Sequence, residues 1–199
     1  MATIKDSGKR TEFATGAVRD IGGKEKGRCD LLPLDVVAEV ADYWEQWQRD
    51  TLLLICKFQH TGAYDYLKIA LSCFGTHTYS DPQTMLLEVS KHFAEGAEKY
   101  SENNWMKGIP LKSYINSAVR HYLKWLRGDA DEPHDRAFVW NILCAIWTCK
   151  HLPELNDYAT KECIVCGKKV RAFAKSCDNC MVYQQNDTEE NLCELEEEC

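Results

Sequence analysis

The sequence predicts an all-α fold, a helical bundle with an N-terminal arm and a small C-terminal zinc ribbon of four cysteines. Apolar residues recur at helical spacing in successive segments between residues 34 and 149, and no convincing strand precedes Cys163. After Pro153 this pattern ends, and two pairs of cysteines follow at the spacing of metal ligands. A chain of 199 residues is long enough for one core and a small appendage.

Local patterns and boundary signals justify each expected element. Residues 1–33 are rich in Gly, Lys, Arg and Asp, so we expect an arm that contributes to a functional site. His60-Thr-Gly62 separates two helical segments, the Asp81-Pro82 pair favours a helix start, and Gly128 ends a helix. The expected helices cover residues 34–58, 63–74, 85–100, 111–126 and 137–149. They form a bundle over residues 34–153, followed by a ribbon over 160–183 and an acidic tail over 184–199.

The net charge of −7 belongs to the tail rather than to the body of the protein. Residues 187–199 contain seven acidic residues and no basic one, whereas the rest of the chain carries 24 acids and 24 bases. The charge therefore says little about the substrate.

The sequence carries no signal for a membrane. No apolar run reaches the roughly 18 residues that a spanning helix needs. No apolar core follows the first ten residues either, so we expect no signal peptide. Without a secretory signal, eleven cysteines do not indicate a disulfide framework, and we expect a cytoplasmic protein.

Two glutamates, Glu95 and Glu98, stand one helical turn apart in the segment 92–100. Side chains at positions i and i+3 of a helix are about 5–6 Å apart, close enough to share one divalent cation. Carboxylate oxygens suit Mg²⁺ or Mn²⁺. A solvated helix face is the simpler explanation. However, Gly96 in mid-helix costs roughly 1 kcal/mol relative to Ala, which suggests that another group approaches closely.

A second acidic cluster, residues 129–135, opens the next helix. Glu132 and Asp135 form an acid pair at i and i+3 and could complete the metal site. Pro133 places Glu132 near the N-cap, however, where both acids could instead complement the helix dipole.

Asp131, His134 and Asn141 form an alternative set, because they fall on one stripe of the same helix. Asn141 stands in a strongly apolar run, where a buried amide without partners would cost a few kcal/mol. It is either a hydrogen-bonding core residue or a residue that reads a ligand.

The four cysteines of the ribbon are Cys163 and Cys166, then, after ten residues, Cys177 and Cys180. This spacing is typical of zinc sites, and four thiolates leave no open position, so we expect a structural Zn²⁺. Structural zinc contributes roughly 10–16 kcal/mol of folding free energy, which a segment this small needs. Three lysines and an arginine between the pairs make the ribbon basic. It could therefore contact nucleic acid, a partner protein or the acidic tail of this chain.

Several blocks of the chain carry a family resemblance. They include His92-Phe-Ala-Glu-Gly-Ala-Glu-Lys-Tyr100, Asn104-Trp-Met-Lys-Gly-Ile-Pro110 and Gly128-Asp-Ala-Asp-Glu132. The others are residues 7–10, 15–20, 26–33, 117–121, 134 and 140–141, and together the blocks cover roughly half of the chain. In this order they resemble the phage-type dATP/dGTP diphosphohydrolase family, a divergent branch of the MazG-like all-α nucleotide pyrophosphohydrolases.

The resemblance implies a MazG-like bundle that cleaves a purine deoxynucleoside triphosphate between the α and β phosphates, giving the monophosphate and pyrophosphate. It implies catalytic Mg²⁺ or Mn²⁺, held by Glu95 and Glu98 and by acids of the second helix. Glu132 and Asp135 fit that second motif by letter, whereas Asn141 fits it by position. In the latter case Asp131 or His134 would supply the missing ligand.

The resemblance also implies roles for individual side chains. The implied catalytic residues are Glu95, Glu98, Arg120, His121, Asp131 and His134. The basic residues that could contact the triphosphate are Arg19, Lys26, Arg28, Lys107, Arg120 and Lys124. Asn104 and Trp105 could read and stack on a purine, and Asn141 could contact the ligand. Each basic residue could instead be a surface charge with a local partner, and Trp105 could simply pack at a helix end.

The chain departs from the family pattern in two places. About 40 residues, near 42–83, are inserted before the Glu95 helix, and they could extend the bundle, form a subunit interface or narrow the substrate choice. The zinc ribbon is also outside the family core. We expect a homo-oligomer, in the host cytoplasm if the chain is phage-encoded. The alternative function is a non-catalytic protein that keeps the fold and sequesters a nucleotide or nucleic acid.

Overall fold

The computed structural model of the chain describes residues 10–20, 26–158, 160–162 and 169–171. The chain divides into two compact units, residues 1–158 and 159–199. The first unit is mostly helical, as predicted. Its helices are α1 (Leu34–Val40), α2 (Gln46–Thr61), α3 (Asp65–Thr78), α4 (Pro82–Tyr100), α5 (Leu111–Arg127) and α6 (His134–His151). Short 3-10 turns are η2 (Cys29–Leu31), η3 (Asn104–Lys107) and η4 (Pro153–Leu155).

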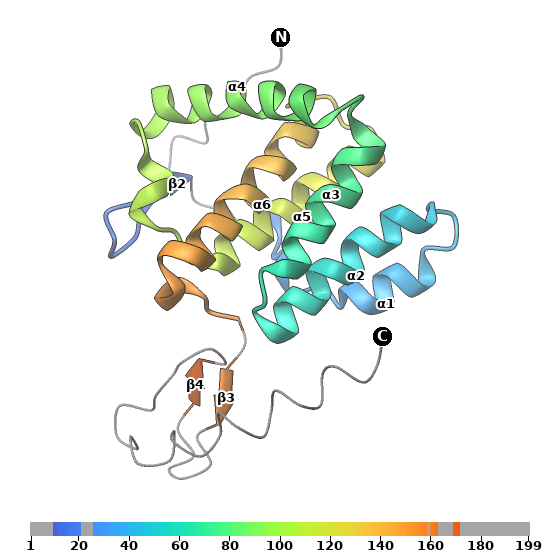
Figure 1. Ribbon diagram of the computed structural model, residues 1–199, viewed down its shortest axis with the longest axis horizontal. Helices are drawn as coiled ribbons and strands as arrows, with labels where there is room; N and C mark the ends of the chain where they lie inside the picture. Colours follow the sequence, from blue (N-terminus) through green and yellow to red (C-terminus); the bar gives the residue numbers. More distant parts are fainter. Residues whose placement is uncertain (1–9, 21–25, 159, 163–168, 172–199) are drawn as a thin grey trace. The chain divides into compact units, whose positions relative to one another are not determined.

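The most extensive helix packing joins α5 to α6, and α6 also contacts α3 and α4. As Figure 1 shows, α4 crosses one end of the layer formed by α3, α5 and α6, and α2 packs on the other side of α3. An aromatic group holds the centre of this layer. The ring centroids of Phe74 and Phe138 are 4.5 Å apart, and Tyr122 lies 5.2 Å from Phe138. All three side chains are fully buried, so the core depends on three helices at once.

The sequence predicts one helix over residues 34–58, and this is wrong, because the chain breaks between α1 and α2. Glu45 begins α2 with a capping box, in which its side chain accepts from the backbone of Gln48 and the Gln48 side chain accepts from the Glu45 backbone. Apolar spacing continues through this break, which is why periodicity did not reveal it. Helix α3 also runs one turn past its predicted end at Phe74.

Other helix ends agree with the sequence signals. Asp81 accepts a hydrogen bond from the backbone N–H of Thr84, and Pro82 occupies the first turn of α4. Gly62 and Gly128 close α2 and α5 in the left-handed conformation, with φ of 69° and 82°.

The prediction of no strand before Cys163 is also wrong. Strands β1 (Arg10–Glu12) and β2 (Val18–Asp20) pair antiparallel within the arm, with Arg10 opposite Asp20. Three residues are too few for an alternating pattern to be recognised. The turn between them depends on Gly16, whose φ of 77° favours glycine.

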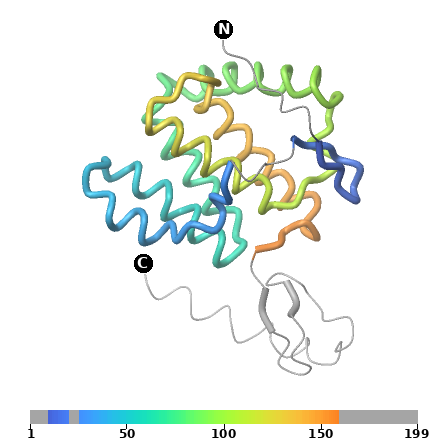
Figure 2. Tube along the Cα trace, turned by 180° about the vertical axis from the view of Figure 1, so that it is seen from behind, coloured from blue at the N-terminus to red at the C-terminus, as the bar shows by residue number. Residues whose placement is uncertain are grey.

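The arm is fixed beside the end of α4 and η3, as Figure 2 shows from behind. The side chain of Asn104 bonds the backbone of Val18 twice, accepting from its N–H and donating to its C=O, both at 2.8 Å. Lys99 forms a nearly buried ion pair with Asp20, at 2.7 Å. The hydroxyl of Tyr100 also donates to Asp20, at 2.7 Å. These contacts hold the intervening residue, Arg19, against the bundle.

In the second unit, the described residues form one antiparallel hairpin of β3 (Thr160–Glu162) and β4 (Lys169–Arg171). The cysteines predicted to bind zinc, Cys163, Cys166, Cys177 and Cys180, lie outside the described residues, as does the acidic tail. Among the helices that the structure describes, none combines the length and the apolarity needed to cross a membrane.

The packing at α6 predicts a large stability effect for Ile142→Ala. Ile142 is fully buried in the central layer, so its truncation should lower the free energy of unfolding by about 2–5 kcal/mol, measured by urea denaturation. Val40→Ala is the control, because Val40 is 68% exposed and should change the stability by less than about 0.5 kcal/mol. Equal effects of the two substitutions would contradict this packing.

Candidate functional site

The described residues enclose a cavity of about 1310 Å³ between the arm, the end of α4, η3, α5 and α6. This is larger than the roughly 300–1,000 Å³ of typical small-molecule pockets. The sequence-predicted site residues that line it are Arg19, Lys26, Asn104, Trp105, Arg120, His121, Lys124, Asp131, Glu132 and Asn141. Side chains separated by more than a hundred positions in the sequence therefore meet in one site.

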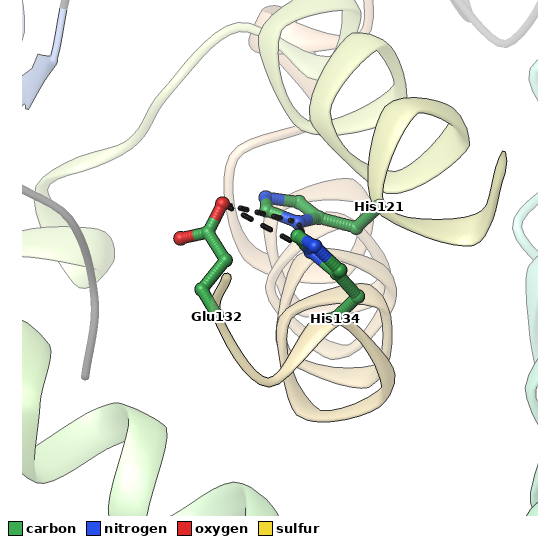
Figure 3. A group of neighbouring side chains, drawn as sticks. All are labelled: His121, Glu132 and His134. Atoms are coloured by element: carbon green, nitrogen blue, oxygen red, sulfur yellow. Dashed lines mark hydrogen bonds and ion pairs between the residues drawn. The ribbon is translucent and has the colours of Figure 1, made fainter. Parts of the chain in front are cut away.

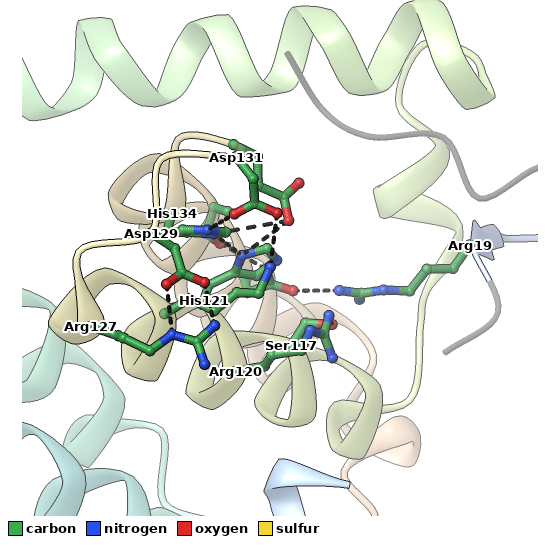
Figure 4. Close-up of polar contacts among 12 residues, drawn as sticks. Arg19, Ser117, Arg120, His121, Arg127, Asp129, Asp131 and His134 are labelled. Atoms are coloured by element: carbon green, nitrogen blue, oxygen red, sulfur yellow. Dashed lines mark hydrogen bonds and ion pairs between the residues drawn. The ribbon is translucent and has the colours of Figure 1, made fainter. Parts of the chain in front are cut away.

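A chain of polar contacts joins α5 to the start of α6 along this cavity (Figure 4). His134 Nε2 lies 2.8 Å from Asp131 Oδ1, and His134 Nδ1 lies 3.0 Å from His121 Nδ1. Asp131 cannot donate when ionised, so the consistent assignment has His134 Nε2–H donating to Asp131 and His121 Nδ1–H donating to His134. This arrangement leaves the Nε2 lone pair of His121 for a ligand or a proton.

Burial keeps His121 neutral in this chain. The loss of solvent is the main cause that lowers its pKa well below the ordinary histidine value, and the nearby Arg120 and His134 act in the same direction. At neutral pH the His121 imidazole is therefore uncharged, and its Nε2 lone pair stays available. The geometry therefore gives the cavity a base, oriented through His134 by Asp131.

Glu132 adds a carboxylate to the two imidazoles. Its Oε1 lies 3.8 Å from His121 Nδ1 and 3.9 Å from His134 Nδ1, and Figure 3 shows it facing both rings. Among the described residues, these three form one group close enough to hold a metal ion, and Asp129, Asp131 and His134 form another. A group with two imidazole nitrogens fits Mg²⁺ poorly, because Mg²⁺ prefers oxygen ligands.

Basic side chains surround the histidine and carboxylate groups. Lys124 pairs with Asp131 at 3.1 Å, and Arg120 donates to Ser117 Oγ at 3.0 Å. Burial lowers the pKa of Arg120, without displacing it from the charged state. Lys26 and Arg127 are exposed at the cavity wall. An anionic ligand would gain from several of these charges together.

The structure does not bring Glu95 and Glu98 to this group. Glu95 is half-buried and pairs with Arg136 of α6 at 3.2 Å, and Glu98 is exposed. Neither lines the cavity, although Gly96 between them does. Asp135, expected beside them, accepts a hydrogen bond from Tyr79 at 2.9 Å.

Two predicted triphosphate contacts also lie away from the cavity. Arg28 is exposed and forms a two-pronged ion pair with the buried Asp30, with Nε–Oδ1 at 2.7 Å. Lys107 is exposed at the end of η3. Arg28 is thus a charge with a local partner, and Lys107 is a surface charge. The sequence left both alternatives open.

Asn104 is placed differently from its expected role as a reader of the base. Both polar ends of its buried amide bond the backbone of Val18, so the residue anchors the arm instead. Trp105 lines the cavity while packing edge-on against Phe93 and Trp147, so its ring meets both the site and the core.

Among the lining residues that sequence reasoning did not assign to the site are His92 and Trp140. Both belong to the blocks of family resemblance, which was the signal that could have identified them. Their ring centroids are 5.5 Å apart, so they form a shared wall between α4 and α6.

The family model described as dATP/dGTP diphosphohydrolase, N-terminal, matches residues 59–158. The matched range covers α3 to α6 and contains the His121, Glu132 and His134 group, while the arm precedes it. No curated protein and no solved structure matched the chain.

The burial of His92 predicts acid-sensitive folding. Burial first, and then the charges of Arg136, Arg19 and Lys99, lower its pKa to about 3 in the folded protein. The unfolded chain takes up the proton near pH 6.5, whereas the folded protein does not. The free energy of unfolding should therefore decrease as the pH is lowered from about 6.5 to about 3, by up to about 1.4 kcal/mol per pH unit from this group.

The measurement compares urea unfolding of the wild type and His92→Gln across that pH range. In the variant, the free energy of unfolding should depend less steeply on pH. The dependence that remains comes from groups such as His121, whose pKa is lowered as well. An unchanged slope, or a His92 titration near pH 6.5 by NMR, would show that the folded protein protonates this side chain readily.

Proposed function

The chain belongs to the dATP/dGTP diphosphohydrolase family, and on this premise we propose that it hydrolyses dATP and dGTP to the monophosphate and pyrophosphate in the cavity between the arm, α4, α5 and α6. The observation that carries the proposal is the His121–His134–Asp131 chain beside a basic wall in one cavity. It supplies a proton acceptor and a place for a polyphosphate in the same space.

Binding of the triphosphate rests on the basic wall. Lys26, Arg120, Lys124 and Arg127 line the cavity and can donate charged hydrogen bonds to phosphate oxygens. Trp105 offers a ring on which a purine could stack. The same arginines and lysines would stabilise the charge that develops on the departing pyrophosphate.

His121 would act as the general base. Its Nε2 accepts a proton from the water that attacks phosphorus, and the ring stays oriented because Nδ1–H donates to His134. Asp131 holds His134 in the tautomer that accepts this bond. The imidazolium formed on His121 would be stabilised by Glu132, which lies 3.8 Å away.

Glu132 and Asp131 are the carboxylates at the cavity wall that would hold a catalytic Mg²⁺ or Mn²⁺. A bound cation would neutralise phosphate charge there. The set of Glu95, Glu98 and Asp135 remains a proposal from the family resemblance, and its geometry lends no support because Glu95 and Asp135 already pair with Arg136 and Tyr79.

We also propose the structural Zn²⁺ at Cys163, Cys166, Cys177 and Cys180, a homo-oligomeric state and cytoplasmic action on free nucleotides. The basic ribbon remains a proposed contact for nucleic acid. All four proposals rest on the sequence pattern.

The activity test incubates the protein with each of the four deoxynucleoside triphosphates and Mg²⁺ or Mn²⁺, and measures pyrophosphate release. We expect turnover of dATP and dGTP, and a loss of about 10²-fold or more in kcat for His121→Asn, because the base is removed. His77→Asn is the control, since His77 is exposed on α3 and stacks on Trp47 away from the cavity. Tight nucleotide binding without turnover would support the sequestering alternative instead.

The zinc proposal has its own measurement. Elemental analysis of the purified chain should find about one zinc per chain, because four thiolates form one closed site. The double variant Cys163→Ser, Cys166→Ser should lose it, whereas Cys149→Ser, a cysteine on α6, should keep it. A wild-type value below about half a zinc per chain would rule out the ribbon.

A further inference from the structure

Three buried donors of the cavity wall have no hydrogen-bond partner among the described residues. They are Arg19 Nη1, His92 Nδ1 and Trp140 Nε1. Arginine and tryptophan can only donate, and the neutral His92 can donate from Nδ1. Buried polar atoms are nearly always paired in folded proteins, so three unpaired donors in one cavity indicate a ligand that brings acceptors.

Trp140 lies at the centre of this group. The His92 ring is 5.5 Å from it, and the Arg19 guanidinium carbon lies 5.8 Å from its centroid. On the other side the guanidinium stacks over Tyr114, at 5.2 Å. Arg19 is thus held between aromatic rings that come from α5 and α6.

The charge of Arg19 has no carboxylate partner within the part of the chain that the structure describes. Its Nη2 donates to the neutral oxygen Oδ1 of Asn141 at 2.6 Å. The neighbouring acid, Asp20, bonds Lys99 and Tyr100. Burial is the main cause that lowers the pKa of Arg19. A desolvated cation without a counter-ion is costly, and an anion placed beside it would remove that cost.

Asn141 sets the direction of this cation. Its Nδ2 donates to the backbone oxygen of Ala137 at 2.7 Å, which turns Oδ1 toward Arg19. An aspartate at the same place would pair with Arg19 and cancel its charge. The amide therefore orients the guanidinium and leaves the charge for a ligand, so Asn141 is a positioning residue.

We propose that Arg19, Trp140 and His92 form a buried anion subsite that binds a phosphate group of the polyphosphate, with Asn141 positioning Arg19. This assignment rests on the proposed function and adds to it the part of the cavity that takes the pyrophosphate end. A purine edge fits less well, because adenine and guanine present donors as well as acceptors, and two of the three unpaired groups, Arg19 and Trp140, can only donate.

The test measures binding of inorganic pyrophosphate by calorimetry, with EDTA present so that no metal bridges the ligand. Arg19→Gln and Asn141→Asp should each weaken binding by about tenfold or more, as expected when a charged hydrogen bond is lost. Deoxyadenosine, which has no phosphate, should bind all proteins equally. Arg49→Gln is the matched control, since Arg49 also has a buried unpaired nitrogen, but it pairs with Asp42 and does not line the cavity.

Each outcome decides the proposal. The subsite is supported if the wild type binds pyrophosphate and both variants bind it about tenfold more weakly or worse. This result does not depend on hydrolysis of a triphosphate, so the subsite and the proposed activity are tested separately. Undetectable binding by the wild type, or equal binding by Arg19→Gln, overturns the subsite proposal. Loss of deoxyadenosine binding instead of pyrophosphate binding would assign Arg19 to the base. Circular dichroism checks folding, and Asn141→Asp, which keeps the size of the side chain, decides the matter if Arg19→Gln does not fold.

Discussion

The packing of α5 against α6 is the constraint on which the rest of the structure depends. It forms the largest helix interface, and it brings His121 of α5 within 3.0 Å of His134 of α6. The aromatic core of Phe74, Tyr122 and Phe138 fixes the two helices laterally, so neither histidine can move without disturbing fully buried rings. Because the core is stable only when the two helices pack closely, the positions of the polar groups that they carry are fixed as well.

The arm depends on the bundle through polar rather than apolar contacts. A three-residue hairpin cannot be stable alone, and here Asn104 pairs with its backbone while Lys99 and Tyr100 hold Asp20. The consequence for the site is that Arg19 enters the cavity at one fixed position. Its two neighbours in the strand carry the anchoring contacts, which leaves its own side chain for Asn141 and the cavity.

Charge is distributed unevenly around the site. Glu95 of α4 pairs with Arg136, and Asp135 of α6 accepts a hydrogen bond from Tyr79. Asp131 and Glu132, in contrast, lie beside the histidines at the cavity wall. Elsewhere in the cavity wall, Arg19 donates to the neutral amide of Asn141 and lies over the Tyr114 ring. The histidine and carboxylate group and the Arg19 guanidinium are thus distinct parts of the cavity, which is the arrangement that the proposed hydrolysis needs for proton transfer and for anion binding.

The sequence by itself determined the helical class and the caps at Asp81, Gly62 and Gly128, because helical periodicity and capping chemistry are local signals. Family blocks also indicated several polar residues that line the cavity, among them His121, Asp131 and Glu132. The sequence missed the break before Glu45, because the apolar helical spacing continues across that break. It also missed the β1–β2 hairpin, because each strand has only three residues. Only the tertiary structure decided that Glu95 pairs with Arg136, that Asn104 anchors the arm and that Arg19 reaches Asn141. These choices depend on which helix faces meet across long stretches of chain, and residue spacing alone carries no information about that.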